Sequence, residues 1–503
     1  MDTLHSLMLG FSVVSTPMNL LYCFIGVLIG TLVGVLPGIG TAGSVAVLLP
    51  FTFGLPPATA IILLAGIWYG AMYGGSTTSI LVNIPGESSS VITCLDGYQM
   101  ARQGRAGRAL GISAIGSFIA GTLSVCLLML VAPVVARYAV KIGPPELFAL
   151  ILFGLTLSAY LSSGPMIKSF MMVALGMILG TQGIDTVSGV QRFTFNINEF
   201  YEGVGILPVI MGIYGVGEIF INLEETIKRD VFKVSIKGLL PDWDDWKASF
   251  GPITRGTFLG FFLGILPASG TLISTFVSYI MEKRLSKHPE RFGKGAIEGV
   301  AGPEAANNAA SSGTFVPLLT FGIPTTATMA LILGALLIHG ITPGPLLILN
   351  HPDVFWGVIV SMYIGNIMLL VLNLPLIGIW VRLLKVPYSI LFPLIFVFCV
   401  IGVYSNQNSL LDVTSMIFFG VIGYLARKTG FECAPLIFAY ILSSIWEEAF
   451  RQSLLMSQGD LSIFVTRPFP AVFIFLTVLF VASSVIFSKK RSNLLEQIGS
   501  ADS

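Results

Sequence analysis

Charged side chains are scarce in this sequence of 503 residues. They make up 11% of the residues, whereas about a quarter of an ordinary soluble domain is charged. Hydrophobic residues account for 54%, so the chain cannot cover a water-exposed surface with polar groups. The composition therefore excludes an ordinary soluble protein. The formal net charge of +1 gives no support for a nucleic acid or a strongly acidic partner.

The sequence motifs of enzymes are missing as well. There is no GxxxxGKS/T phosphate-binding loop, because GKG at residues 293–295 lacks both the spacing and the hydroxyl residue. HExxH, GxSxG and the paired aspartates of membrane prenyl transfer are absent. The five cysteines form no CxxC pair, and we assign them no disulfide or metal role. We expect a protein that is not an enzyme and that carries no cofactor.

Long apolar segments are abundant. Windows of about 20 residues with few or no charges recur, and each can cross the ~30 Å hydrocarbon core of a bilayer as a helix. The clearest are residues 17–36, 109–135, 147–167, 354–374, 386–403 and 468–487. The 55 glycines and 27 prolines predict broken helices, which a membrane tolerates only beside protein or a water-filled cavity. We predict an all-α polytopic membrane protein with roughly 12 or more transmembrane helices.

The two halves of the chain resemble each other. Residues 26–44 (GVLIGTLVGVLPGIGTAGS) align without a gap on residues 256–274 (GTFLGFFLGILPASGTLIS), with their glycines in register. A second, weaker correspondence aligns residues 74–85 (GGSTTSILVNIP) with residues 313–324 (GTFVPLLTFGIP). Internal repeats of this kind are common in secondary transporters.

Each repeat has a glycine-lined helix face followed by an LPxxGT break. A GxxxGxxxG face lets two helix backbones approach closely. The proline and glycine then end the helix and leave free N–H and C=O groups near Thr41 and Thr271. Those groups are satisfied either by neighbouring helices, in a re-entrant turn, or by a bound solute. Because the break occurs at matched positions in both halves, we favour a solute site.

Lysines and arginines occupy opposite places in the two repeats. In the first repeat they follow the second element, at Arg102, Arg105 and Arg108. In the second repeat they lie between the two elements, at Lys283, Arg284, Lys287, Arg291 and Lys294. Because basic loops face the cytoplasm, this swap predicts two repeats of inverted topology.

We divide the chain on this basis into a first repeat half (1–222), a cytoplasmic or interfacial connector (223–253), a second repeat half (254–488) and a cytoplasmic tail (489–503). The connector is basic around residues 228–237 and carries Trp243 and Trp246, which suits the membrane interface. The basic residues at 489–491 place the C-terminus in the cytoplasm.

Small polar residues gather in two segments of this apolar chain. Hydroxyls, amides and exposed backbone N–H groups bind a carboxylate where no arginine is at hand, and oxygens of the same segments can ligate a cation such as sodium. The alternative is that these residues hold transmembrane helices together. With the break residues, the candidate substrate-binding residues are Gly38, Gly40, Thr41, Ser76, Thr77, Thr78, Asn83, Ser269, Gly270, Thr271, Asn307, Asn308, Ser311, Ser312, Thr314, Thr325 and Thr326.

Acidic residues are few within the predicted membrane segments. Glu304 lies near Asn307, and Glu87 precedes three serines. Each either binds a proton or another cation or caps a helix, and the sequence leaves both possibilities open. Glu447, together with Glu218 and Glu448, is expected to pair or to reach the interface from a helix end.

Longer blocks carry a family resemblance. They are GVLPGIGTAG with YGGSTTSILVNIPGESSSVITCLDGYQMARQGRAGRALG, and GILPASGT with PEAANNAASSGTFVPLLTFGIPTTATMALILGALLIHGITPGP. These blocks, within residues 26–111 and 256–345, resemble the large membrane subunit of the tripartite tricarboxylate transporters, the TctA family.

The resemblance implies a carrier in the bacterial inner membrane that imports di- or tricarboxylates such as citrate, driven by a gradient of sodium or protons. It also implies two partners, a small membrane subunit (TctB-like) and a periplasmic solute-binding protein (TctC-like). A membrane-embedded sensor or scaffold that has kept the carrier fold is an alternative, and a passive channel is a third. Two occluding breaks of opposite orientation suit alternating access better than an open pore.

Overall fold

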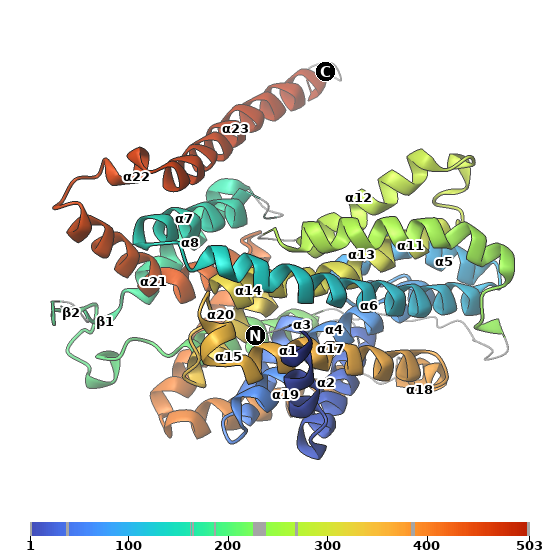
Figure 1. The fold of residues 1–503 in the computed structure, drawn as a ribbon, viewed down its shortest axis with the longest axis horizontal. Coiled ribbons are helices and arrows are strands. Elements are labelled where there is room, and N and C mark those ends of the chain that lie inside the picture. Colours follow the sequence, from blue (N-terminus) through green and yellow to red (C-terminus); the bar gives the residue numbers. More distant parts are fainter. Residues whose placement is uncertain are drawn as a thin grey trace. The chain divides into compact units, whose positions relative to one another are not determined.

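The computed structural model of the chain describes residues 3–36, 40–160, 162, 165–185, 188–224, 238–266, 270–383 and 388–499. Nearly all of its regular structure is helical (Figure 1). Within these ranges the one sheet is a short antiparallel pair, β1 (Gly183–Ile184) and β2 (Gln191–Arg192). The all-α prediction is therefore confirmed.

Five helices of the described ranges are long and apolar enough to cross a membrane. They are α2 (Pro17–Val35), α4 (Pro57–Val82), α6 (Ala106–Ala139), α17 (Pro352–Asn373) and α20 (Leu410–Lys428). Shorter apolar helices accompany them, so the chain is a multi-pass membrane protein. The larger helix count expected from the sequence stays a prediction.

One apolar window is divided between two helices. Residues 147–167 contribute to α7 (Pro144–Tyr160) and to α8 (Met166–Gly180), which begins after Pro165. Proline disfavours the helical conformation in the residue before it, so a new helix begins there and the window is not one span.

The chain divides into two compact units. The first comprises residues 1–139 and 205–425, and the second comprises residues 140–204 and 426–503. The remaining helices of the first unit are α1 (Thr3–Val14), α3 (Thr41–Leu48), η1 (Leu49–Thr52), η2 (Ser88–Ser90), α5 (Val91–Arg102), α9 (Ile206–Ile210), the π-helical turn η4 (Met211–Val216), α10 (Gly217–Glu224), α11 (Trp243–Gly264), α12 (Gly270–Leu285), η6 (Pro289–Arg291), α13 (Glu298–Gly313), α14 (Phe315–Phe321), α15 (Ala327–Ile338), α16 (Leu347–Asn350), α18 (Ile377–Leu383) and α19 (Tyr388–Gln407). The second unit adds η3 (Asn198–Phe200), α21 (Ala434–Met456), α22 (Ile463–Thr466) and α23 (Pro468–Gly499) to α7, α8 and the hairpin.

Both LPxxGT segments interrupt a helix, as predicted. In the first repeat α2 ends at Val35 and α3 begins at Thr41, after Gly40 with φ of +65°. In the second repeat α11 ends at Gly264 and α12 begins at Gly270. Residues 37–39 and 267–269, which include the candidates Gly38 and Ser269, lie outside the described residues, as does the connector at 225–237.

The glycine-lined face of α2 packs on a second glycine-lined face, on α4. A Cβ atom added to Gly66, Gly70 or Gly74 of α4 would lie 3.0–3.1 Å from a glycine Cα of α2. Those α2 glycines are Gly26, Gly30 and Gly34. No side chain fits between the helices, so they contact each other backbone to backbone.

The second repeat packs in the same way. A Cβ atom on Gly260 or Gly264 of α11 would lie 2.7 Å from the Cα of Ala306 or Ala310 on α13. The glycines of α11 face the carbonyl groups of residues 302, 306 and 310, and those of α2 face the carbonyl groups of residues 63, 67 and 71. Each of these carbonyl residues in the second repeat follows its counterpart in the first by the same number of residues that separates residues 313–324 from residues 74–85. The sequence alignment therefore agrees with the packing of the helices.

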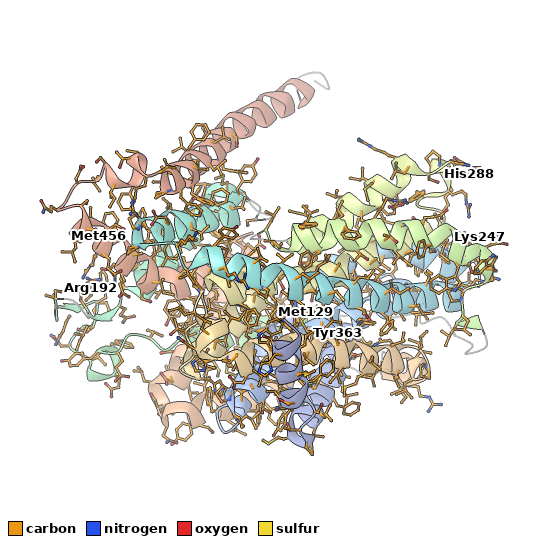
Figure 2. All side chains as sticks on the ribbon, viewed as in Figure 1. Met129, Arg192, Lys247, His288, Tyr363 and Met456 are labelled. Carbon is orange, nitrogen blue, oxygen red and sulfur yellow. The ribbon has the colours of Figure 1, made fainter. Side chains whose placement is uncertain are left out.

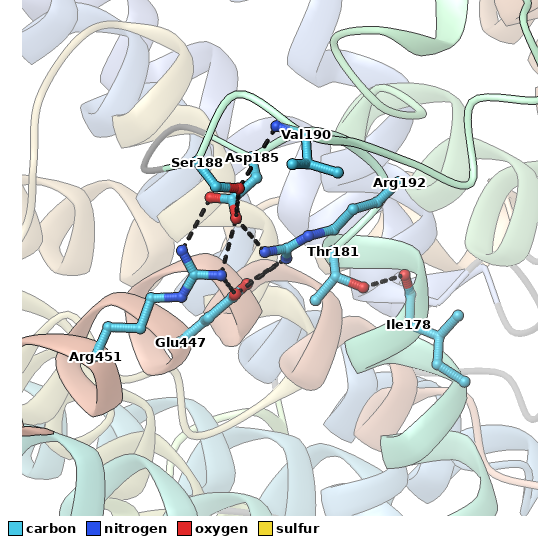
Figure 3. A network of polar contacts seen from close by, with 8 residues as sticks. All are labelled: Ile178, Thr181, Asp185, Ser188, Val190, Arg192, Glu447 and Arg451. Atoms are coloured by element: carbon cyan, nitrogen blue, oxygen red, sulfur yellow. Dashed lines mark hydrogen bonds and ion pairs between the residues drawn. The ribbon is translucent and has the colours of Figure 1, made fainter. Parts of the chain in front are cut away.

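In the second unit, two arginines and two carboxylates fix the β1–β2 hairpin to α21 (Figure 3). Arg451 donates to Asp185 at 3.0 and 2.9 Å, and Arg192 donates to Glu447 at 3.0 Å. Arg192 also pairs with Asp185, and Arg451 with Glu447 at 2.6 Å. Because each charge meets two opposite charges, the network is neutral in itself, and the expected pairing of Glu447 is confirmed.

We predict that Gly30→Ala destabilises the protein, because the added Cβ would lie 2.5 Å from the Ile67 carbonyl oxygen and 2.9 Å from the Gly70 Cα. Overpacking of this kind costs about 1–3 kcal/mol. The measurement is the unfolding midpoint of the detergent-solubilised protein. Gly54→Ala is the matched control, because its Cβ would have no neighbour within 4 Å. Equal midpoints for the two variants would contradict the close packing.

Candidate functional site

Each repeat has a left-handed residue followed by a proline. α4 ends at Asn83 with φ of +58°, and α14 ends at Gly322 with φ of +69°. Pro85 and Pro324 follow two residues later. Glycine and asparagine adopt this conformation most readily. Asn83 therefore has a role in the backbone turn, independent of any contact with a solute.

Glu87 follows this turn and contacts the first break. The Thr41 hydroxyl donates to Oε2 of Glu87, and the Ser88 hydroxyl donates to Oε1 at 3.2 Å. Glu87 is also the N-cap of η2, where it forms a capping box with Ser90. The candidate Thr41 thus lies at a carboxylate of its own repeat, at the point where α3 begins.

The helices that begin at the two breaks pack on opposite repeats. α3 of the first repeat packs against α15 of the second. In return, α12 of the second repeat packs against η2 and α5 of the first. α3 therefore lies against the helix that follows the left-handed Gly322, and α12 lies against the helices that follow the left-handed Asn83. We also predict that the two breaks lie close together, but residues 37–39 and 267–269 of these breaks lie outside the described residues.

A second carboxylate, Glu304, lies on α13 and is 1% exposed. The hydroxyls of Ser76 on α4 and Thr93 on α5 donate to its two oxygens. Glu304 thus links α13 of the second repeat to two helices of the first. In the described part of the chain, no Lys, Arg or His forms an ion pair with it.

A polar cavity of about 10 Å³ lies between α4, α6, α13 and α17. That volume has room for about one water molecule. Three of the candidate residues line it: Asn308, Ser311 and Ser312. Its other lining residues are Tyr69, Tyr73, Gly121, Val125, Met362 and Asn366.

Hydrogen bonds tie the cavity walls together. Asn308 Nδ2 donates to Ser117 Oγ of α6 at 2.7 Å, and Ser124 Oγ donates to Ser312 Oγ at 2.9 Å. On the α17 side, the Tyr73 hydroxyl donates to Asn366 Oδ1. All four helices around the cavity are therefore joined by polar side chains.

Two candidate residues have buried polar atoms without a partner in the described residues. Asn307 is 1% exposed, and neither its amide nitrogen nor its amide oxygen has a hydrogen bond. Thr325 is fully buried, and its hydroxyl oxygen also lacks a partner. Leaving a buried polar group unpaired costs about 1–3 kcal/mol, so such groups usually have a ligand, a water or a functional reason.

Some candidates satisfy helix ends or hold helices together, which is the alternative to binding a solute. Thr78 donates to the carbonyl groups of Gly34 and Val35 at 3.2 and 3.0 Å, which satisfies the end of α2 at the first break. Thr314 donates to the Ser311 carbonyl at 2.6 Å. The Thr326 hydroxyl caps α15 by accepting from the Met329 backbone N–H. Thr77, Gly270 and Thr271 are buried.

Sequence reasoning missed residues that the fold brings to these sites, namely Trp68, Tyr69, Tyr73, Thr93, Ser117 and Asn366. Trp68 Nε1 donates to the Ser311 carbonyl at 3.1 Å. Asn366 was detectable as a polar residue in the otherwise apolar window 354–374. Among the described residues, no group of three His, Cys, Asp or Glu is placed to hold a metal.

The basic loops of the two repeats meet at one end of the first unit. Arg105 donates to the Gly295 carbonyl at 2.8 Å, and Gln103 donates to the Lys294 carbonyl at 2.7 Å. Asp96 of α5 is fully buried and accepts from the Tyr279 hydroxyl at 2.8 Å. It also accepts from backbone N–H groups of residues 293, 295 and 296.

The N-terminus of α11 joins the same end, because Arg108 pairs with Asp242 at 2.7 Å. The Asp245 backbone N–H, together with Arg108, lowers the pKa of the Asp242 carboxyl. Lys247 near the start of α11 and His288 after α12 lie at one end of the α11–α12 hairpin (Figure 2).

The uncharged loops also lie together. His339 at the end of α15 and Thr52 at the end of η1 form a hydrogen bond of 3.2 Å between Nε2 and Oγ1. The loops at residues 53–56 and 340–346 follow these two residues. The uncharged loops of the two repeats are thus neighbours, and so are the basic loops.

These features define a multi-pass membrane protein with polar groups buried among broken helices. Residues 20–438 match the family described as the tripartite tricarboxylate transporter TctA family. The chain belongs to this family, which is a family of transporters.

Two relatives come from Agrobacterium vitis. An uncharacterized 52.8 kDa protein in the TAR-I ttuC' 3' region is 51% identical over 471 residues, which cover 94% of each chain. An uncharacterized protein in the TAR-II ttuC' 3' region is 51% identical over 212 residues, which cover 42% of this chain and 88% of the relative. No solved structure matches the chain.

We predict that Asn308→Leu weakens transport about tenfold or more, since a hydrogen bond to a charged group is worth roughly 1.5–3 kcal/mol. The measurement is initial uptake at limiting solute, normalised to the amount of folded protein. Asn373→Leu is the matched control, because Asn373 is equally buried in a membrane helix but does not line the cavity. Normal uptake by Asn308→Leu would assign the α13 cluster to helix packing.

Proposed function

We propose that this chain is the large permease subunit of a binding-protein-dependent secondary transporter that imports di- or tricarboxylates across the bacterial inner membrane. A small membrane subunit and a periplasmic solute-binding protein complete the system, and a gradient of sodium or protons drives it. Membership of the TctA family supports the class of transporter and its tripartite plan.

The observation that carries the proposal is the buried polar cluster on α13 and its partners. Asn307 has an amide with no hydrogen-bond partner among the described residues, and Asn308 lines a polar cavity; both residues are buried on α13. Polar side chains in a membrane core are costly unless they serve packing or a solute pathway. A cavity of about 10 Å³ is too small for a carboxylate, so transport of a carboxylate through this site requires the cavity to enlarge.

The charges around this cluster favour transport coupled to a cation. Residues 1–101 and 295–381 contain no lysine or arginine, although they supply nearly all the candidate residues. They do contain the carboxylates Glu87 and Glu304. An anionic solute that entered here without a cation would add negative charge to a region of low dielectric constant. A cation that binds with the solute removes this penalty.

We further propose that the two repeats have inverted topology. Arg105 and Lys294, from basic loops at different places in the two repeats, belong to segments that are hydrogen-bonded to each other. One cytoplasmic face for both loops satisfies the positive-inside rule. The matched glycine packing of α2 with α4 and of α11 with α13 supports the repeat itself. The connector and the C-terminal tail are cytoplasmic in this arrangement.

Uptake into membrane vesicles tests the function. Vesicles that contain this chain and its small membrane subunit, supplied with the binding protein encoded beside them, are expected to accumulate a labelled di- or tricarboxylate. Accumulation above the outside concentration requires a sodium or proton gradient, whereas a channel would only equilibrate the solute. Vesicles without this chain are the control. Absence of uptake across a panel of carboxylates would favour the sensor or scaffold.

Cysteine labelling tests the topology. We expect a membrane-impermeant maleimide, added to intact cells, to leave Arg105→Cys and Arg291→Cys unlabelled and to label them in opened cells. Gly54→Cys lies in an uncharged loop with no neighbour around its Cβ and is the periplasmic control. Labelling of either arginine position from outside would rule out the inverted arrangement.

A further inference from the structure

Glu304 is a buried carboxylate whose negative charge has no counter-charge among the described residues. It is 1% exposed, and it accepts hydrogen bonds from neutral hydroxyls, those of Ser76 and Thr93, with Ser113 also beside it. An isolated carboxylate in a low-dielectric interior is costly. Neutral hydrogen bonds reduce this cost but do not neutralise the charge. A bound cation or a proton would neutralise it.

Asn307 lies one turn further along the same helix. Residues three apart on a helix are neighbours on one face, so its side chain projects from the face of α13 that carries Glu304. Neither polar atom of the Asn307 amide has a hydrogen-bond partner in the described part of the chain, although the residue is 1% exposed. An amide oxygen on the same helix face as a carboxylate is a second oxygen ligand for a hard cation.

We propose that Glu304, Ser76, Thr93 and Asn307 form the binding site for the coupling sodium ion. The proposal rests on the proposed carboxylate transport and names the residues that bind its cation. The donor set is a carboxylate, two hydroxyl oxygens and one amide oxygen, which suits a hard cation better than nitrogen or sulfur ligands would. To bind sodium, the two hydroxyls turn their lone pairs inward and release the carboxylate. A proton would neutralise Glu304 equally but would leave the Asn307 amide unused.

The other membrane carboxylate is a weaker candidate for this ion. Glu87 caps η2 through a capping box and contacts the Thr41 hydroxyl, so its oxygens already serve the local backbone turn. The asparagine nearest to it in the sequence is Asn83, which forms the left-handed turn. Glu304 has no such local role, because it lies in the middle of α13.

The position of the ion explains how it is coupled to the solute. Asn307 and Asn308 are adjacent on α13, three and four residues after Glu304, and Asn308 also lines the cavity with Ser311 and Ser312. α4 likewise contributes Ser76 to the ion site and Tyr73 to the cavity. Sodium that draws α4, α5 and α13 together therefore fixes two walls of the cavity, so each ligand strengthens the binding of the other.

The experiment measures sodium dependence in proteoliposomes that contain this chain and the small subunit, with binding protein and labelled carboxylate outside. Sodium is varied against choline at constant ionic strength. Glu304→Gln keeps hydrogen-bonding capacity but loses the charge, and Asn307→Ala removes an amide that forms no hydrogen bond among the described residues. We expect Glu304→Gln to lose sodium dependence, and Asn307→Ala to raise the half-saturating sodium concentration about tenfold. Glu290→Gln, an exposed carboxylate that pairs with His288, is the control and keeps wild-type dependence.

A second measurement does not depend on transport. Sodium that binds the folded state raises the unfolding midpoint of the purified protein. We expect this shift in the wild-type protein and in Glu290→Gln, and we expect its loss in Glu304→Gln.

The outcomes separate this proposal from the proposed function. Wild-type sodium dependence in Glu304→Gln, in uptake and in thermal stability, would overturn the site while leaving carboxylate transport intact. Uptake driven by a pH gradient and indifferent to sodium would refute the proposal that the coupling ion is sodium. Absence of any carboxylate uptake by the wild-type protein would refute the proposed function, and the thermal shift would still decide whether sodium binds at Glu304.

Discussion

Backbone-to-backbone contact between glycine-lined helices is the constraint on which the rest of the first unit depends. α2 and α4 touch at Gly30 and Gly70, and α11 and α13 touch at Gly260 and Ala306, with no room for a Cβ atom at the glycines. Close approach brings the end of α2 within reach of Thr78, whose hydroxyl bonds the last carbonyl groups of that helix. A helix can therefore stop inside the protein without leaving its polar groups unpaired, as a membrane interior requires.

The polar stretches of the two repeats also contact each other. α4 of the first repeat packs on α13 of the second, which brings these stretches side by side. Ser76 of α4 reaches Glu304 of α13, and Trp68 of α4 donates to the Ser311 carbonyl. These contacts join the two glycine-packed helix pairs through polar groups.

Much of the fold could be predicted from the sequence because its signals are local. Glycine spacing predicted the close helix faces, LPxxGT predicted the two breaks, and apolar composition predicted a multi-pass helical protein. The polar clusters predicted Asn308, Ser311 and Ser312 as substrate-binding residues; these three line one cavity, and their role in binding stays a prediction. The division at Pro165 was missed because apolar composition alone does not show where one helix ends and the next begins.

The remaining partners could not be predicted, because they are joined only by the folded chain. Thr93 and Glu304, or Tyr73 and Asn366, are separated by more than 200 residues, and no local pattern links them. Their pairing nevertheless decides what the candidate residues can do. Thr78 and Thr326 are occupied by helix ends, whereas Asn307 has both polar atoms free in the described residues. Residues of similar chemistry in one motif therefore separate into those whose hydroxyls are used at helix ends and those, such as Asn307, whose polar atoms have no partner among the described residues and can bind a ligand.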